Sequence, residues 1–570
     1  MSLSAADLQV LIARLTGVAD QMGAVLQRSA FSPNIKERAD CSAAVFDASG
    51  RVLAQAAHIP VHLGSMPASV AAVVRAFDTG AGVADSALGP GEHAIVNDPF
   101  RGGTHLNDVT VVTPVWVDGV LRGWVANRAH HADLGGAAPG SLPADATDVA
   151  QEGLRIPPSR LTLDLRELVL ANSRTPWERS GDLDAQVGAN VVGAERLAPL
   201  LAQPTGEVLD HGERLARSAI ARLPDGEWSA EDRMDSIGPG GPPARLCCTV
   251  RIDGEDMEFD FTGTDPQGWG NVNAVEAVTV SAVTYVLRSI VDHALPANEG
   301  ALRPVNVVAP AGSIVAASFP AAVGAGNVEV SQRIVDVATL ALAQVPGLAV
   351  PAASQGTMNN LLVGASGRDG TGAANSWVYY ETIGGGQGGR PPRPDRLDGV
   401  PQPGMSGVHT HMTNTRNTPV EALERSYPLR VRSLRLRPGT GGTGAAPGGD
   451  GIERTVELLA DAVVSLITER RSSGPWGLDG GGDGAVGRNE VLRARPDGST
   501  GPAEVVGDKV TLRLRSGDIV RIGTPGGGGW GTGTPSDWSP VPLSAPSAPV
   551  PTWDGITPDD PEEHPGSWRS

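Results

Sequence analysis

The spacing of apolar residues along the chain alternates between a helical and a strand period. From Leu8 to Val25 apolar residues recur every three or four positions, and Ser4 stands before them as a helix cap. This pattern predicts one long amphipathic helix at the start of the chain. Similar stretches predict further helices over residues 161–170, 184–201, 207–223, 277–291 and 324–343.

Strand-like patterns appear as short hairpins and as alternating runs. Residues 43–55 and 246–265 each consist of two β-rich segments around a turn. Residues 429–436 and 510–515 alternate apolar with basic side chains, as half-exposed antiparallel strands do. The chain is therefore predicted to be α+β, with mixed antiparallel sheets, packed helices and a C-terminal β-rich region.

A chain of 570 residues is too long for one hydrophobic core, so several domains are expected. We predict an N-terminal α+β region over residues 1–160 and a central α/β region with glycine-rich loops over 161–428. A β-rich region follows over 429–532. Residues 533–570 are rich in proline, serine and acidic residues, which predicts a disordered tail.

Charge and composition exclude several kinds of partner. The chain has 45 basic and 64 acidic residues and a formal charge of −19, which argues against nucleic acid and anionic membranes. No apolar run is long enough for a membrane span, and no secretion signal is visible. Three cysteines without a Cys-x-x-Cys pair argue against disulfides and cysteine-bound zinc. We expect a soluble, cytoplasmic protein.

The clearest local signal is a hairpin around Asp118-Gly119, with β-rich runs on both sides. If Val117 and Val120 flank a two-residue turn, the numbers of facing residues sum to 237. Asp108 then faces Ala129, and the open end of the hairpin gathers polar residues. These are His105, Asp108, His130, His131 and Asp133.

Imidazole and carboxylate without thiolate suit zinc, manganese or iron, so this end of the hairpin is a candidate metal site. Side-chain alternation places Asp108 on the same face as His131 and opposite His130. A one-residue bulge would reverse that choice, so the sequence leaves open which histidine is the ligand. The alternative interpretation is a set of solvated polar residues at the strand ends.

Other segments supply candidates for catalysis and substrate binding. His58 and His62 lie on a predicted loop, because Pro60 between them breaks a helix. The long loop over 139–158 is expected to cover the open end of the hairpin. It brings Glu152 and Arg155 toward the site, unless these two form a surface ion pair.

Two polar or glycine-rich runs are candidate walls of a substrate pocket. The run 381–390 lets the backbone approach another group closely. The run 409–421 is dense in hydrogen-bonding side chains, which are costly to bury unless they bind something or each other. The predicted substrate-binding residues are Gly385, Gly386, Asn414, Arg416 and Asn417.

Several of these segments together resemble the hydantoinase B/5-oxoprolinase family, and the resemblance runs from about residue 5 to 532. The matching motifs are Asn97–Asp108, Ala126–Asp133, Gln151–Gly153, Ala325–Glu329, Ser354–Asn360, His411–Glu421 and Thr524–Gly529. One departure is Gln387, where the family often has an aromatic residue in its glycine run.

The resemblance implies a B-type component whose partner, a hydantoinase A-type ATPase with an actin-like fold, binds ATP and phosphorylates a carbonyl oxygen. It implies that a divalent metal, zinc or manganese, sits on this chain and that His105, Asp108 and His130 hold it. The expected reaction is ATP-dependent hydrolysis of a cyclic amide, a lactam or hydantoin, in a hetero-oligomer. Glu152, or whichever of His130 and His131 is not a ligand, is the candidate general base.

Two alternatives remain from the same resemblance. The chain could be a subunit of an ATP-dependent ketone carboxylase of the acetone or acetophenone type. It could also be a non-catalytic scaffold for the A-type ATPase.

Overall fold

The first helix, α1 (Ala5–Ser29), begins where the Ser4 side chain accepts the backbone N–H of Asp7. The predicted apolar stripe is confirmed, because its residues are buried from Leu8 to Leu26. The structure is a computed structural model, and it describes residues 3–56, 59–77, 87–290, 295–367, 376–392 and 400–533. His58 and nearly all of the predicted tail lie outside these ranges.

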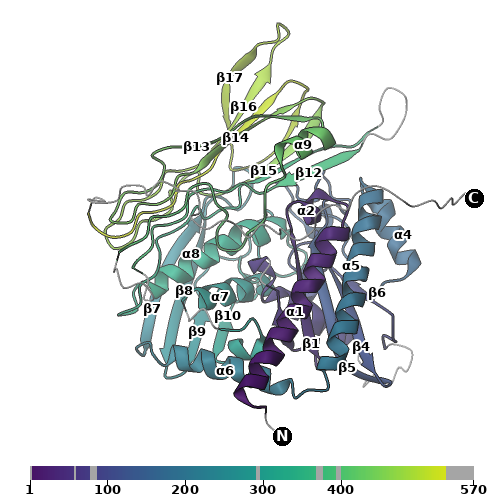
Figure 1. Cartoon of the computed structure of the whole chain (residues 1–570). Coiled ribbons are helices and arrows are strands. Elements are labelled where there is room, and N and C mark those ends of the chain that lie inside the picture. The colour runs from purple at the N-terminus through teal and green to yellow at the C-terminus, as the bar shows by residue number, and fades with distance from the viewer. Residues whose placement is uncertain are drawn as a thin grey trace, which may run out of the picture. The chain divides into compact units, whose positions relative to one another are not determined.

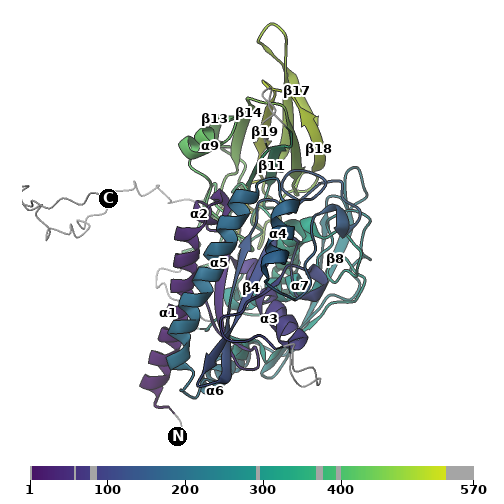
Figure 2. The ribbon, with the colours of Figure 1, turned by 90° about the vertical axis from the view of Figure 1, so that its right-hand side faces the viewer.

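A six-stranded antiparallel sheet forms the N-terminal part of the fold, in the order β2-β1-β5-β4-β3-β6. Helices cover both of its faces (Figures 1 and 2). Ala43 and Val45 of β1 pack with α1, whereas Ala44 and Phe46 pack with α3. The bounds are β1 (Cys41–Asp47), β2 (Val52–Gln55), α3 (Ser65–Ala76), β3 (Ala94–Val96), β4 (Asp108–Val117), β5 (Val120–His130) and β6 (Ser159–Arg160).

Three helices follow this sheet in the chain, close to the positions predicted for them. They are α4 (Leu163–Asn172), α5 (Pro176–Leu197) and α6 (Gly206–Ile220). Helix α5 lies alongside α1 in both views (Figures 1 and 2). The two helices approach closely at Gly193, where a Cβ atom would lie 2.3 Å from Sδ of Met22.

A second sheet has four strands in the order β10-β9-β8-β7, and only β10 and β9 are parallel. The burial of β7 alternates between exposed and half-buried residues, as in a sheet with one solvent-facing side. Helices α7 and α8 pack against this region of the fold. The bounds are β7 (Gly226–Met234), β8 (Ala244–Asp253), β9 (Asp256–Asp260), α7 (Glu276–Ile290), β10 (Val305–Val308) and α8 (Ser331–Leu342).

The C-terminal region is rich in strands, as predicted, and forms two further sheets. Their orders are β12-β11-β15-β18 and β13-β14-β19-β16-β17. The bounds are β11 (Asn360–Ala365), β12 (Trp377–Glu381), α9 (Val420–Ser426), β13 (Leu429–Leu436), β14 (Ile452–Leu458), β15 (Ala462–Ile467), β16 (Arg488–Ala494), β17 (Thr500–Val506), β18 (Lys509–Leu514) and β19 (Ile519–Gly523).

The α+β class is confirmed, with antiparallel and mixed sheets and a β-rich C-terminal part. The first of the two C-terminal sheets takes strands from both sides of residue 428, because β11 pairs with both β12 and β15. The division into domains at residues 160 and 428 stays a prediction. Among the described residues, no helix is both long and apolar enough to cross a membrane.

Extended glycine-rich segments beside these sheets pack backbone against backbone. Gly386 donates its N–H to the carbonyl of Pro525 at 3.0 Å, and Gly527 donates to Gly449 at 2.9 Å. A Cβ atom on Gly386 would lie 2.0 Å from the carbonyl oxygen of Gly449. The glycines of this run are therefore required by the close approach of the chain to itself.

Candidate metal centre

The hairpin of β4 and β5 has a bulge that decides which histidine faces Asp108. Near the turn, Val117 pairs with Val120, as predicted. The register then shifts, so that Val115 pairs with Gly123 and Asp108 pairs with His130. The predicted pairing of Asp108 with Ala129 is wrong, because the bulge adds one residue to β5 and reverses the face of every residue beyond it.

The bulge lies where the sheet is tightly packed. Next to it, Gly123 comes so close to β1 that a Cβ atom would lie 2.6 Å from the carbonyl oxygen of Phe46. Glycine in a strand often marks such a close approach of two backbones. The register of the hairpin is thus tied to the packing of its neighbouring strand.

His105, Asp108 and His130 form a compact cluster of metal-ligand type. Their donor atoms lie within 4.8 Å of one another, and the three side chains are at most 3% exposed. Oδ1 of Asp108 is 3.2 Å from Nε2 of His105 and 3.4 Å from Nδ1 of His130. Nε2 of each histidine is buried without a hydrogen-bond partner, which leaves these nitrogens available to a cation.

Hydrogen bonds around the cluster orient its ligands. Thr104 and Asn327 donate to Oδ2 of Asp108 at 2.5 and 3.2 Å, so that Oδ1 faces the two imidazoles. Nδ1 of His105 lies 3.3 Å from the carbonyl oxygen of Gly324, which places a proton on Nδ1. Such outer contacts fix the tautomer and angle of metal ligands in known sites.

Asn327 reaches Asp108 from an irregular helical turn. Residues Gly326–Val330 form a π-helical turn that leads into α8, where the sequence predicted the entry to a regular helix. π-helical turns of this kind occur often at functional sites. The anion-binding alternative at this helix start stays a prediction.

Two residues that were not predicted as ligands complete the surroundings of Asp108. Nε2 of His62 lies 3.4 Å from Oδ2 of Asp108, and its Nδ1 lies 2.9 Å from Oγ of Ser42. Asp40 borders the same cavity, and its carbonyl accepts the backbone N–H of His130. Asp40 directly precedes a β-rich run, and this position was the signal that could have found it.

A cavity of about 20 Å³ lies at this cluster, with room for about one water-sized group. Its walls come from distant parts of the chain. They include Asp40, His62, His105, Asp108, His130, Asn327, Tyr380, Thr382, Met412 and Thr413.

Burial and mutual charge give the members of the cluster different protonation states. Burial would raise the pKa of Asp108, but the charges of His105 and His62 outweigh it and hold this pKa well below its usual value. Burial alone would lower the pKa of His105, yet Asp108 raises it. Burial lowers the pKa of His130 to about 3 and raises that of Asp40 to about 6. The pair of Asp108 and His105 therefore carries opposite charges, whereas His130 is neutral.

His131 and Asp133 lie outside this cluster. Nε2 of His131 lies 2.9 Å from Oε1 of Gln186 on α5, on the other face of the sheet from Asp108. Asp133 accepts hydrogen bonds from Arg174 and from backbone N–H groups of its own loop, including Gly140. Both residues hold the hairpin against its surroundings, which accounts for their burial.

Glu152 is buried next to the cluster but does not border the cavity. Its carboxylate accepts the backbone N–H groups of Val323 and Gly324, at 3.0 and 2.8 Å. Burial raises its pKa to about 7, although these two N–H groups lower it. Glu152 thus anchors the turn whose carbonyl faces His105.

The residues predicted to bind substrate fall in two places. Gly385 and Gly386 belong to the backbone-packed glycine segments, where a Cβ on Gly385 would lie 2.2 Å from Oε1 of Gln355. Asn414, Arg416 and Asn417 are solvent-exposed. They follow Met412 and Thr413 of the cavity wall, so only this second group lies beside the cluster.

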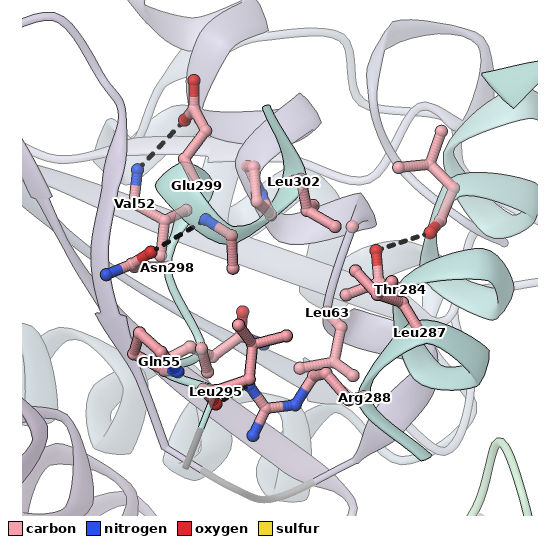
Figure 3. Close-up of a pocket in the computed structure, with 16 residues that line it drawn as sticks. Val52, Gln55, Leu63, Thr284, Leu287, Arg288, Leu295, Asn298, Glu299 and Leu302 are labelled. Atoms are coloured by element: carbon pink, nitrogen blue, oxygen red, sulfur yellow. Dashed lines mark hydrogen bonds between the residues drawn. The ribbon is translucent and has the colours of Figure 1, made fainter. Parts of the chain in front are cut away.

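A second cavity, of about 110 Å³, lies between β2 and α7 and is mainly apolar (Figure 3). It shares no lining residue with the cavity at Asp108. Arg288 borders it, but its guanidinium donates to the carbonyl of Leu295 at 2.8 Å. The potential metal ligands of the described residues are gathered at Asp108 and not here.

Comparisons with known proteins agree over nearly the whole chain. A family model described as Hydantoinase B/oxoprolinase matches residues 4–533. The 5-oxoprolinase 1 of Arabidopsis thaliana is 36% identical over 562 residues, which cover 92% of this chain and 42% of the plant protein. A putative D-/L-hydantoinase B-type component of Pseudomonas sp. (strain NS671) is 32% identical, over 92% of this chain and 89% of that protein.

A solved structure shares the fold. The ATP-dependent caprolactamase from Pseudomonas jessenii has a TM-score of 0.81 at 24% identity, over 93% of this chain and 92% of that one. The chain spans 40% to 42% of the length of the 5-oxoprolinases it matches.

Proposed function

Because the chain belongs to the hydantoinase B/oxoprolinase family, we propose that it carries the hydrolytic site of an ATP-dependent enzyme that opens cyclic amides. The observation that carries this proposal is the buried cluster of His105, Asp108 and His130 around a cavity of water size. No other group of three potential metal ligands occurs in the described part of the chain.

We propose that His105, Asp108 and His130 hold a divalent cation, zinc or manganese. The residues fit such an ion, since two unpartnered imidazole nitrogens and a carboxylate oxygen converge and no thiol is near. When bound, a divalent cation lowers the pKa of water or polarises a carbonyl oxygen. Asp108 supplies the negative charge, and Thr104 and Asn327 keep its carboxylate oriented.

Asp40 is placed to accept a proton in this cavity. It borders the space beside His105, and no hydrogen bond engages its carboxylate among the described residues. A general base must lie within hydrogen-bond reach of the attacking water, and the small cavity imposes that proximity. Glu152, whose carboxylate is bound by two backbone N–H groups, acts as a positioning residue behind His105.

The activation step belongs to a partner in this proposal. An amide is a poor electrophile, and phosphorylation of its oxygen by an A-type ATPase supplies a good leaving group. The hydantoinase relative from Pseudomonas sp. is a chain of similar extent, and the longer 5-oxoprolinases contain additional sequence. The chain would therefore work in a hetero-oligomer that binds ATP on the partner.

The test is to purify the chain with its ATPase partner and measure ATP-dependent ring opening of 5-oxoproline, hydantoin and caprolactam. The metal content of each preparation is determined by mass spectrometry. Asp108→Ala is expected to lose the metal and at least about 100-fold in ring opening, since it removes a ligand. A metal-free wild type with full activity, or ATP turnover that requires a ketone and bicarbonate, would contradict the proposal.

A further inference from the structure

Five arginine side chains are fully buried in the described chain, and one of them stands apart. They are Arg38, Arg128, Arg179, Arg333 and Arg470. A buried charge is costly unless it is paired or fully hydrogen-bonded. The partners of each guanidinium therefore show which of these charges the protein itself compensates.

Three of the five have carboxylate partners within the fold. Arg179 lies 2.8 Å from Asp182, and Arg470 lies 2.6 Å from Asp336. Arg333 also contacts Asp336, at 3.5 Å. These charges are neutralised by the protein.

Arg128 has no carboxylate partner but all three of its nitrogens are bonded. Nε donates to Thr110, Nη1 to Ser65 and Nη2 to Ser69, at 2.5 to 2.8 Å. Its role in the fold is thus complete without any further group.

Arg38 has neither kind of compensation. Nη1 donates to the carbonyl of Tyr380 at 2.7 Å, and Nη2 donates to Oγ1 of Thr382 at 3.2 Å. Nε has no partner, and Nη2 keeps a second N–H. No described carboxylate lies within 4.0 Å of the guanidinium. The nearby acid Glu381 is already paired with Arg454.

Arg38 borders the candidate metal centre. Its guanidinium lies over the ring of Tyr380, 4.6 Å from the ring centre, and the same ring stacks on His130 at 4.8 Å. Tyr380 and Thr382 both line the cavity at Asp108. The positive charge is therefore separated from that cavity by one layer of side chains.

The adjoining polar segment also has unsatisfied groups. Arg416 donates its backbone N–H to the carbonyl of Arg38, and both ring nitrogens of His409 lack a partner. Burial, reinforced by the charge of Arg38, lowers the pKa of His409 to about 4. This histidine is therefore a neutral ring that can donate one N–H near the guanidinium.

We propose that Arg38 binds an anionic oxygen group of the reacting molecule, a carboxylate or a phosphoryl group, beside the metal centre. The inference rests on the proposed hydrolytic function and adds the substrate class, an anion at this point. The water-sized cavity cannot hold a cyclic amide, so the rest of the molecule must contact the wall beyond it. An unpartnered Nε and an Nη2 with a free N–H suit the two-point binding that carboxylate and phosphate favour.

The experiment is a binding titration of the full-length, metal-loaded chain with three probes. 5-Oxoproline carries a carboxylate, 2-pyrrolidinone is the same ring without it, and inorganic phosphate represents the phosphoryl group. Arg38→Gln is expected to weaken binding of at least one anion by tenfold or more and to leave 2-pyrrolidinone unchanged. The exposed Arg425 of α9 provides the matched control, Arg425→Gln, which should bind every probe like the wild type.

The probes also distinguish the two sources of the anion. A loss for 5-oxoproline alone assigns a carboxylate, and a loss for phosphate alone assigns the phosphoryl group. If Arg38→Gln does not fold, Arg38→Lys replaces it, and the same tenfold loss is expected because lysine cannot bind at two points. Unchanged anion binding in the folded variant, or no anion binding by the wild type, would overturn the proposal.

Metal content separates this inference from the proposed function. Arg38→Gln should keep the metal of the wild type, because no ligand is removed. A metal-free wild type would refute the hydrolytic proposal. A normal metal content with unchanged anion binding would refute the role of Arg38 alone.

Discussion

Asp108 and His130 face each other directly across β4 and β5, with 3.4 Å between Oδ1 and Nδ1. His131, the next residue, lies on the opposite face against Gln186. His130→Ala should therefore reduce metal affinity by at least about 100-fold, as expected for the loss of a ligand. His131→Gln should keep the metal. Mass spectrometry of the purified proteins after dialysis measures both, and the reverse pattern would contradict the register.

Asn327 is the matched test of the outer contacts. Its Nδ2 donates to Oδ2 of Asp108, and removal of such a partner typically costs about 10- to 100-fold in metal affinity. Asn327→Ala should weaken metal binding by that amount without abolishing it. The neighbouring Val328→Ala removes no donor and should leave the affinity within about threefold of wild type. Competition with a chromophoric chelator gives both constants, and equal affinities for the two variants would exclude the role of Asn327.

The hairpin shows how far sequence reasoning reaches. The turn at Asp118-Gly119 is local chemistry, so the elements and the residues at their open end could be predicted. The bulge next to Gly123 could not, because it depends on the packing of β1 against β5. Asp40 joins the site for the same reason, since its strand lies beside His130 only in the folded sheet.

The glycine-rich runs show the same limit. Their composition indicates a close approach of the backbone to some group. The sequence does not say whether that group is a ligand or the chain itself. Gly386 approaches the backbone at Gly449, and only the assembled strands of the C-terminal region establish this contact.

Metal binding should depend on pH through one proton. The pKa of His105 is raised by Asp108, so its ring is protonated in the metal-free protein and must lose that proton to bind a cation. His130, with a pKa of about 3, is already neutral between about pH 5 and 8. Affinity should fall about tenfold per pH unit below the pKa of His105 and level off above it. Chelator competition at several pH values measures the slope, and two protons released per metal would contradict this assignment.

Gly386 and Gly188 form a pair that tests the glycine packing. Alanine at 386 would place a Cβ 2.0 Å from the carbonyl oxygen of Gly449, whereas alanine at 188 meets nothing within 4 Å. Gly386→Ala should destabilise the protein by at least about 1–3 kcal/mol, because backbone must move. Gly188→Ala in α5 should stabilise it by about 0.5–1 kcal/mol. Thermal unfolding of both variants is the measurement. Equal midpoints would show that the segments are loosely packed.

Lys509 and Glu469 form a fully buried ion pair that joins β18 to the loop after β15. Oε2 of Glu469 also contacts Arg333 at 3.4 Å, and Lys509 also contacts Asp508 at 2.9 Å. Removing one partner leaves an uncompensated charge, so Lys509→Met and Glu469→Gln should each cost about 3–5 kcal/mol.

The double variant Lys509→Met/Glu469→Gln is the control for this pair, because it removes both charges together. It should be less destabilised than the sum of the single variants, by about 1–3 kcal/mol of coupling. Urea unfolding of the four proteins gives this coupling from the differences in unfolding free energy. Strict additivity would mean that Arg333 and Asp508 compensate the two charges independently, and the direct pair would then add little to the stability of this region.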